Sequence, residues 1–243
     1  MAALAELGPG PAFTPEQRER RFFLGMAIAI TAFVLFGFGG YIVVGYSSFH
    51  APWWAHVHAV SYTVWIGLYL TQNWLVVRGD LATHRKLGRF MGGLALWLVV
   101  VGTALLYLSM SAHRSPPPVF TAAMLIVMDE LAILGFAALV MAGLANRHRS
   151  DWHRRLMLSA TVCIIAPAFG RITVLTIGFS WPAIIAMQLA MIAVAMAFDW
   201  RTRGQIHPAL WWGAGLIAGI GVASPLLAQA PAMIAFANTV AGG

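Results

Sequence analysis

The stretch RGDLATHRKLGRFMGGLALWLVVVGTALLYLSM, residues 78–110, contains the pattern that decides the fold: a short basic segment followed by a long apolar run. Of the fifteen Lys and Arg residues in the chain, thirteen lie in four such segments. These segments are residues 16–21, 78–89, 147–155 and 201–203. Because basic residues are retained on the cytoplasmic side of a membrane, the sequence predicts a polytopic membrane protein with a cytoplasmic N-terminus.

The composition supports this prediction. The chain is 60% hydrophobic and 9% charged, whereas soluble domains contain about 25% charged residues. A net charge of +7 would suggest nucleic acid as the partner of a soluble protein. Here the charge is confined to loops, where it fits membrane topology and contact with anionic headgroups. We therefore expect the lipid bilayer, and no nucleic acid, as the partner of these residues.

Hydrophobic segment length gives the number of crossings. A hydrocarbon core about 30 Å thick requires about 20 apolar residues per helix. The segments that meet this requirement are 22–45, 54–77, 90–110, 119–145, 156–179, 181–199 and 208–228. We expect one all-α bundle of seven transmembrane helices over residues 22–228, with tails at 1–21 and 229–243. An odd number of crossings places the C-terminus outside, and the expected location is the plasma (inner) membrane of a bacterium.

Small residues and one proline predict local features of the bundle. Two G-x-x-x-G pairs, Gly88 with Gly92 and Gly215 with Gly219, predict close helix packing. Pro167 lies inside the fifth predicted span and cannot donate a hydrogen bond to the carbonyl four residues earlier. A kink is therefore expected there.

Several polar residues lie at membrane depth, where ionisable groups are costly and tend to be functional. They are His56, His58, Asp129, Glu130, Arg171 and Gln188. We expect them to form one polar site open to the outside. Arg171 is predicted to pair with Asp129 or Glu130, since a pair lowers the cost of burying either charge. The alternative is an ion pair that only fixes helix register.

The second predicted helix has a polar and aromatic face. Spacings of three and four residues place His58, Tyr62, Trp65, Tyr69 and Gln72 on one side. His56 is about 200° around the helix from His58 and does not share this side. The face suits the wall of a cofactor or ligand site, and it also suits ordinary packing within a bundle.

Two histidines open parallel helices on the cytoplasmic side. His84 precedes the third predicted span and shares a face with Gly88 and Gly92, whereas His153 precedes the fifth. Axial haem ligands can come from two facing helices, so a b-type haem held by His84 and His153 is a natural prediction. The alternative is that both are interfacial residues facing lipid phosphates.

These two helix starts carry a resemblance. His84-Arg-Lys-Leu-Gly-Arg89 and His153-Arg-Arg-Leu-Met157 resemble the helix starts of an uncharacterised bacterial polytopic membrane-protein family, over roughly residues 50–175. More distantly, the layout resembles transmembrane dihaem b-type cytochromes of the ascorbate-reducible kind. That resemblance implies His84 and His153 as an inner haem pair and His56 or His58 as one outer ligand. The fourth predicted helix, however, has no histidine to complete an outer pair.

The leading prediction is a haem-binding membrane protein that transfers electrons, with His84 and His153 as the metal ligands. His58, Tyr62 and Tyr69 are expected to contribute to the binding of a cofactor or a quinone-like small molecule. Asp129, Glu130 and Arg171 are expected to handle protons or propionate charge.

Two other functions stay open. One is a small-solute or proton-coupled carrier that uses the buried polar residues, and the other is a non-catalytic subunit of a membrane complex or homo-oligomer. A retinal pump is not expected, because it needs a lysine within a membrane span and the only lysine, Lys86, is predicted to lie in a basic loop. No catalytic residue is predicted.

Overall fold

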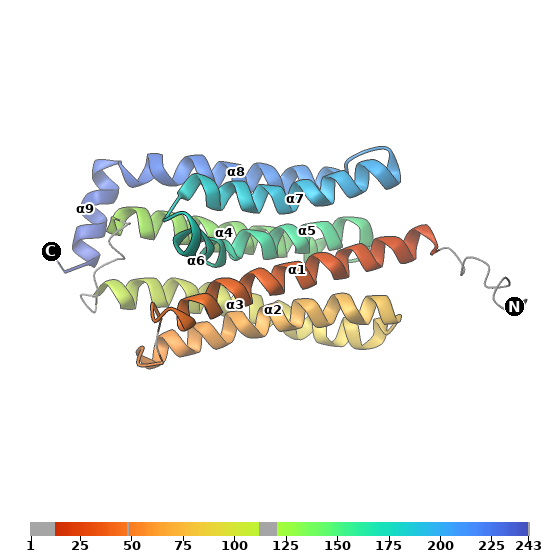
Figure 1. The fold of residues 1–243 in the computed structure, drawn as a ribbon, viewed down its shortest axis with the longest axis horizontal. Helices are drawn as coiled ribbons and strands as arrows, with labels where there is room; N and C mark the ends of the chain where they lie inside the picture. Colours follow the sequence, from red (N-terminus) through yellow and green to blue (C-terminus); the bar gives the residue numbers. More distant parts are fainter. Residues whose placement is uncertain (1–12, 48, 112–120, 243) are drawn as a thin grey trace, which may run out of the picture.

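The computed structural model describes residues 13–47, 49–111 and 121–242, and within these ranges it contains helices and no strands. The helices are α1 (Pro15–Val43), α2 (Trp53–Arg78), α3 (Leu81–Ser111), α4 (Ala122–Ala145), α5 (Ser150–Ile164), α6 (Ala166–Thr176), α7 (Trp181–Arg203), α8 (Pro208–Ala228) and α9 (Pro231–Val240). The long helices run side by side along one axis, and the short α9 lies across one end (Figure 1). The predicted all-α helical bundle is confirmed.

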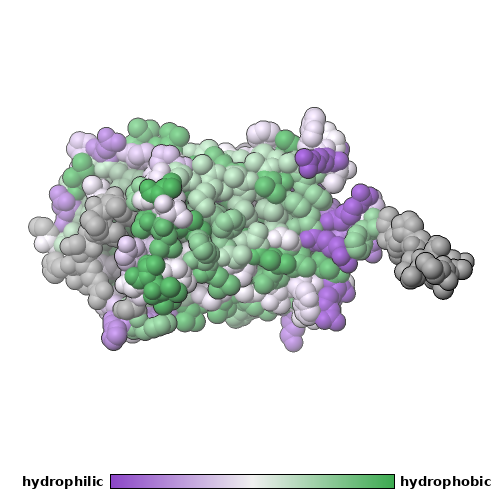
Figure 2. Space-filling model, in the orientation of Figure 1, coloured by the Kyte–Doolittle hydropathy of each residue, from purple (hydrophilic) through white to green (hydrophobic). Residues whose placement is uncertain are grey.

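Helix length and composition make this a multi-pass membrane protein. Within the described residues, α1, α3, α4, α7 and α8 are each long and apolar enough to cross a membrane. The bent pair α5 and α6 passes the same test when taken together. On the face shown in Figure 2, apolar surface covers the middle of the bundle and hydrophilic surface lies at the two ends, with more of it where α1 begins. The described residues therefore contain five or six helical segments able to cross a membrane, rather than the seven expected.

The difference from seven lies in α2. This helix spans Trp53–Arg78, close to the predicted 54–77, and packs against both α1 and α3. Although α2 is long enough, it is not among the helices that are apolar enough to cross a membrane. The reason is the polar and aromatic face recognised in the sequence, since Tyr69 and Gln72 on that face are buried inside the bundle.

Several helices are longer than the hydrophobic segments that predicted them. The third begins at Leu81 rather than at 90, and α1 begins at Pro15, inside the predicted N-terminal tail. Thr14 caps α1, and its hydroxyl accepts a hydrogen bond from the amide of Gln17. Hydropathy detects only the part of a helix that lies in hydrocarbon, so polar first turns are missed. The predicted C-terminal tail contains the helix α9, which is apolar but, at 10 residues, too short to meet the length requirement for a crossing.

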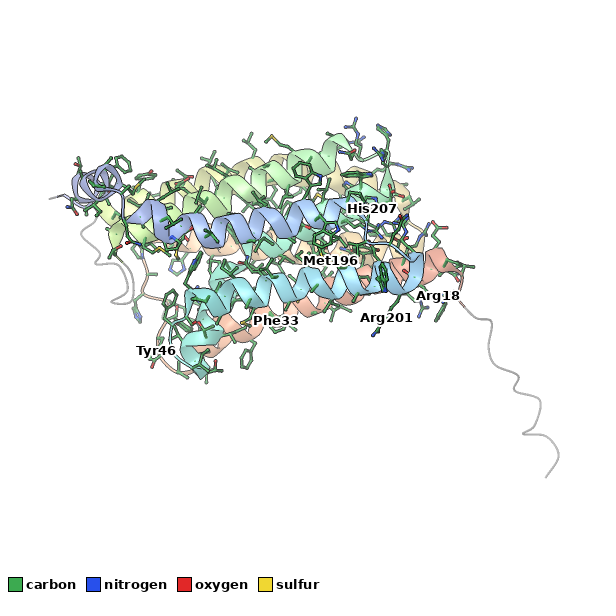
Figure 3. The ribbon with its side chains drawn as sticks, turned by 90° about the horizontal axis from the view of Figure 1, so that it is seen from above. Arg18, Phe33, Tyr46, Met196, Arg201 and His207 are labelled. Carbon is green, nitrogen blue, oxygen red and sulfur yellow. The ribbon has the colours of Figure 1, made fainter. Side chains whose placement is uncertain are left out.

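All four basic segments lie at one end of the bundle, which we call the basic end. Arg18, Arg201 and His207 lie together toward this end, and Tyr46 lies toward the opposite, far end (Figure 3). Gly79 makes the α2–α3 turn there possible, because its φ of +78° is readily adopted by glycine. Arg114, which the sequence places in another connection, lies outside the described residues.

The predicted kink in the fifth span is confirmed. Helices α5 and α6 meet at an angle of 47° next to Pro167. The side-chain amide of Gln188, on α7, donates to the carbonyls of Val162 and Cys163 at 2.8 and 2.9 Å. Gln188 thus satisfies backbone acceptors that the break leaves without helical partners. It serves the kink rather than the polar site in which it was predicted.

The two G-x-x-x-G pairs differ. A side chain added at Gly88 would meet the Gln72 amide at 3.3 Å, and one at Gly92 would meet Leu144 at 3.7 Å, so this pair packs helices as predicted. Gly215 and Gly219 face no described atom within 4 Å. That second pair therefore does not pack helices within the described part of the chain.

Candidate functional site

The histidines that open α3 and α5 come together at the basic end. The ring centroids of His84 and His153 are 6.4 Å apart, and the ring planes are perpendicular at 89°. Both side chains are half-buried. The two helices each pack against α4.

The two imidazoles have different hydrogen-bonding environments. Nδ1 of His153 lies 2.8 Å from the carbonyl oxygen of Gly143, near the end of α4. Because a carbonyl only accepts, Nδ1 carries the proton and the Nε2 lone pair is left available. Nδ1 of His84 is buried without a hydrogen-bond partner. One ring is therefore already oriented as metal-bound histidines usually are, and the other is not.

The spacing of this pair fits haem iron. A metal–imidazole bond is about 2 Å long, so two imidazoles on opposite sides of one iron hold their centroids about 6 Å apart. Across residues 13–47, 49–111 and 121–242, no group of three or more His, Cys, Asp or Glu side chains could hold a metal ion. Haem needs only two protein ligands, because the porphyrin supplies the other four. The donor set therefore fits a haem better than a bare metal ion.

A network of charged groups, the basic-end clamp, holds the first turns of α5. Its members are Glu19, Asp151, Arg155, Asp199 and His207. The Arg155 side chain is fully buried, and its guanidinium binds Asp199 through two nitrogens, Nε to Oδ2 at 2.8 Å and Nη2 to Oδ1. Nη2 also lies 2.8 Å from Glu19 of α1. One arginine of α5 is thus paired with carboxylates of α1 and α7.

His207 extends the clamp to α8. Its backbone amide donates to Asp199 at 3.1 Å, its Nε2 lies 3.2 Å from Asp151, and its Nδ1 accepts from the amide of Ala209. Nδ1 must be unprotonated to accept, so Nε2 carries the proton and donates to Asp151. Burial, together with the positive charge of Arg155, lowers the pKa of His207 from its ordinary value. His207 is therefore a neutral member of the clamp.

A second polar group, the far-end cluster, is formed by side chains carried on α2, α3, α4 and α6. Its members are His58, Tyr62, Thr103, Asp129, Glu130 and Arg171. The rings of His58 and Tyr62 stack at 4.3 Å, and the Tyr62 hydroxyl donates to the carbonyl of Leu98 at 3.1 Å. Thr103 donates to Glu130 Oε2 at 3.2 Å. These contacts join α2, α3 and α4, whereas Arg171 on α6 interacts with His58 and Asp129 only through longer-range charge.

The predicted ion pair in this cluster is wrong. No ion pair joins Arg171 to Asp129 or Glu130 among the residues that the structure describes. The Arg171 guanidinium lies 4.0 Å above the ring of Phe38 and donates to the carbonyl of Pro167 in its own helix. The bend between α5 and α6 changes the direction of the segment that carries Arg171, and the sequence did not give that direction.

Unpartnered polar atoms remain around this cluster. Nδ1 of His58 and Oε1 of Glu130 are buried without a hydrogen-bond partner, and so is the indole nitrogen of Trp65, about two turns along α2 from His58. Buried polar atoms are normally satisfied by protein, water or ligand. These atoms are therefore positions where water or a small molecule would bind.

No protein-family model, curated protein or solved structure matches this chain. Its function must therefore be argued from its own residues.

The remaining predicted site residues lie elsewhere. Tyr69 is 4% exposed and belongs to the hydrophobic core. His56 is half-buried on α2. The clamp is not predicted from the sequence, because Glu19 falls in a predicted tail and Asp199 at the end of a predicted span. The available signal was an acidic residue in the last turn of the sixth predicted helix, at the same membrane side as the arginines that open the fifth.

Proposed function

We propose that this protein binds one b-type haem between His84 and His153 and transfers electrons within a membrane. The observation that carries the proposal is the 6.4 Å separation of the two imidazole rings, which come from helices α3 and α5. When bound, haem would supply one-electron chemistry. The Gly143 carbonyl would keep Nε2 of His153 free for the iron, and the basic-end clamp would fix the turn of α5 that carries this histidine.

The proposal includes a topology of seven crossings. α2 would be the seventh span, because it is 26 residues long and packs against α1 and α3. Its polar face is turned into the bundle, where lipid does not reach it. The basic end would face the cytoplasm of a bacterial cell, since this end carries the four basic segments.

This orientation can be measured in intact cells. A cysteine that replaces Arg149, in the α4–α5 connection, should not react with a membrane-impermeant label, whereas one introduced near Tyr46 should. The matched control is the unmodified protein, whose Cys163 is buried. Labelling at position 149 alone would contradict the orientation.

The far-end cluster would hold a second, small ligand. Its buried atoms include acceptors and donors without partners, and the nearby guanidinium and carboxylates carry opposite charges without pairing. A quinone-like molecule, which accepts hydrogen bonds when oxidised and donates them when reduced, suits such a mixture. Asp129 and Glu130 would then exchange the protons that accompany its reduction.

Haem binding is tested by the absorbance of purified variants. His84→Ala and His153→Ala should each abolish a low-spin b-type spectrum, because two axial imidazoles keep the iron low-spin. His148→Ala is the matched control, since His148 is exposed in the loop before α5. A wild-type protein that stays colourless after expression with ample haem, and gains no Soret band on haem titration, would refute the proposal.

A small-solute or proton-coupled carrier is the second candidate. Two observations favour it: the unpaired charged groups of the far-end cluster and the broken α5–α6 span, because discontinuous helices are a feature of carriers. This function predicts a colourless protein in which substitution of Asp129, Glu130, Arg171 or His58 abolishes transport. Substitution of His84 or His153 would then leave transport unchanged.

A further inference from the structure

The two proposed haem ligands are not equally supported. A neutral imidazole that binds iron through Nε2 carries a proton on Nδ1, and that proton is normally donated to a carbonyl or carboxylate. The Gly143 carbonyl accepts it from His153 at 2.8 Å. Nδ1 of His84 is buried and has no partner. His84 therefore needs an acceptor that His153 already has.

Gln72, on α2, is placed to provide this acceptor. Its side chain is 8% exposed and its amide nitrogen donates to the backbone carbonyl of His84 at 3.2 Å. The amide oxygen, Oε1, is buried without a partner. Thus two residues that are already hydrogen-bonded to each other carry one unpartnered donor and one unpartnered acceptor.

Gly88, on α3, leaves space for the side-chain amide of Gln72. A Cβ atom at Gly88 would lie 3.3 Å from the amide nitrogen of Gln72, closer than most such contacts. Glycine therefore lets the Gln72 side chain reach the first turn of α3. This gives His84 and Gly88, four residues apart, a shared role: the histidine provides the ligand and the glycine admits the side chain that orients it.

From this arrangement we infer that Gln72 is a positioning residue for His84, accepting the Nδ1 proton through Oε1 when His84 binds haem iron. The inference rests on the proposed function. An acceptor at Nδ1 makes the imidazole a stronger electron donor and so favours ferric over ferrous iron. Gln72 therefore sets the midpoint potential of the haem as well as the orientation of the ring.

The test is an optical redox titration of the haem-loaded protein. Gln72→Leu removes the acceptor and should raise the midpoint potential, with about a tenfold loss of preference for ferric iron, or about 59 mV for a one-electron couple. Gln72→Glu supplies a stronger acceptor and should lower it. Opposite signs from two substitutions at one position are not expected of a residue that only fills space.

Two further variants complete the design. Asn73→Ala is the matched control, because among the described residues the hydrogen bonds of the Asn73 side chain go only to Tyr69 of its own helix and none reaches His84. Its potential should equal that of wild type. Gly88→Ala displaces the amide of Gln72 without changing its chemistry, and should shift the potential in the same direction as Gln72→Leu by a smaller amount.

The outcomes separate the two proposals. Wild-type protein without haem would refute the proposed function and this inference with it. Wild-type protein with a low-spin haem, and Leu and Glu variants that match the Asn73→Ala control or shift in the same direction, would overturn the role of Gln72 alone. If Gln72→Leu fails to fold, the Glu and Gly88→Ala variants, with predicted shifts of opposite sign, decide the question.

Discussion

The two ends of the bundle treat buried charge in opposite ways. At the basic end, Arg155 is fully buried and binds both Asp199 and Glu19, so its charge is neutralised within the clamp. At the far end, Arg171 interacts with Asp129 through charge but forms no ion pair with it among the described residues, and Glu130 keeps one buried oxygen unpartnered. A satisfied network fixes structure, whereas an unsatisfied one leaves positions for water or a ligand. The comparison indicates that stability depends on the first group and ligand chemistry on the second.

The largest effect should come from breaking the clamp. Arg155→Met leaves the buried Asp199 carboxylate without its cationic partner, and removing one member of a buried ion pair costs about 3–5 kcal/mol. Thermal unfolding in detergent would measure this loss. The double variant Arg155→Met, Asp199→Leu should recover most of the stability, because it leaves no unpaired charge. If Arg155→Met were as stable as wild type, the clamp would not stabilise the protein, and the contrast between the two ends of the bundle would be wrong.

Substitution of Gln188 should have an intermediate effect. Gln188→Leu leaves the carbonyls of Val162 and Cys163 without their side-chain donor, which we expect to cost about 1–2 kcal/mol. Gln229→Leu is the control, because the exposed amide of Gln229 binds only its own helix. Equal melting temperatures for the two variants would show that Gln188 does not support the kink.

Arg171 should matter less for stability than Arg155. Arg171→Met loses a cation–π contact with Phe38, worth about 1 kcal/mol or less at a partly exposed site. Asp129→Asn should leave the melting temperature unchanged, since no described donor binds this carboxylate. A loss from Arg171→Met as large as that from Arg155→Met would instead show that Arg171 is paired.

The sequence predicted the bundle and the histidine pair for related reasons. The basic segments mark the ends of the predicted helices that lie on one side of the membrane. His84 and His153 each lie in such a segment, so the sequence could place both at the same end of the bundle. The direction of Arg171 could not be predicted, because the angle at Pro167 depends on packing against α1 and α7. Gln188 was assigned to the wrong role because its acceptors exist only once that break has formed.

The smallest effect should be a pH dependence of the clamp. The pKa of His207 is lowered in the folded protein, so between that value and the ordinary value near 6.5 the unfolded chain binds more protons. Wild-type stability should therefore fall as the pH drops from about 7 to about 5. His207→Asn keeps a capping side chain without a titrating group and should flatten the profile. The exposed His148→Asn control should not, and identical profiles for all three proteins would exclude His207 as the cause.

The central claim, that His84 and His153 are the axial ligands of one haem, is tested most directly by near-infrared magnetic circular dichroism of the ferric protein, which distinguishes pairs of axial ligands. The account predicts the low-spin signature of two histidines in the wild type. His153→Met should change it to that of one histidine and one methionine, while His148→Ala retains the wild-type signature. A signature that is unchanged in His153→Met, or a wild-type iron that is high-spin, would contradict the account.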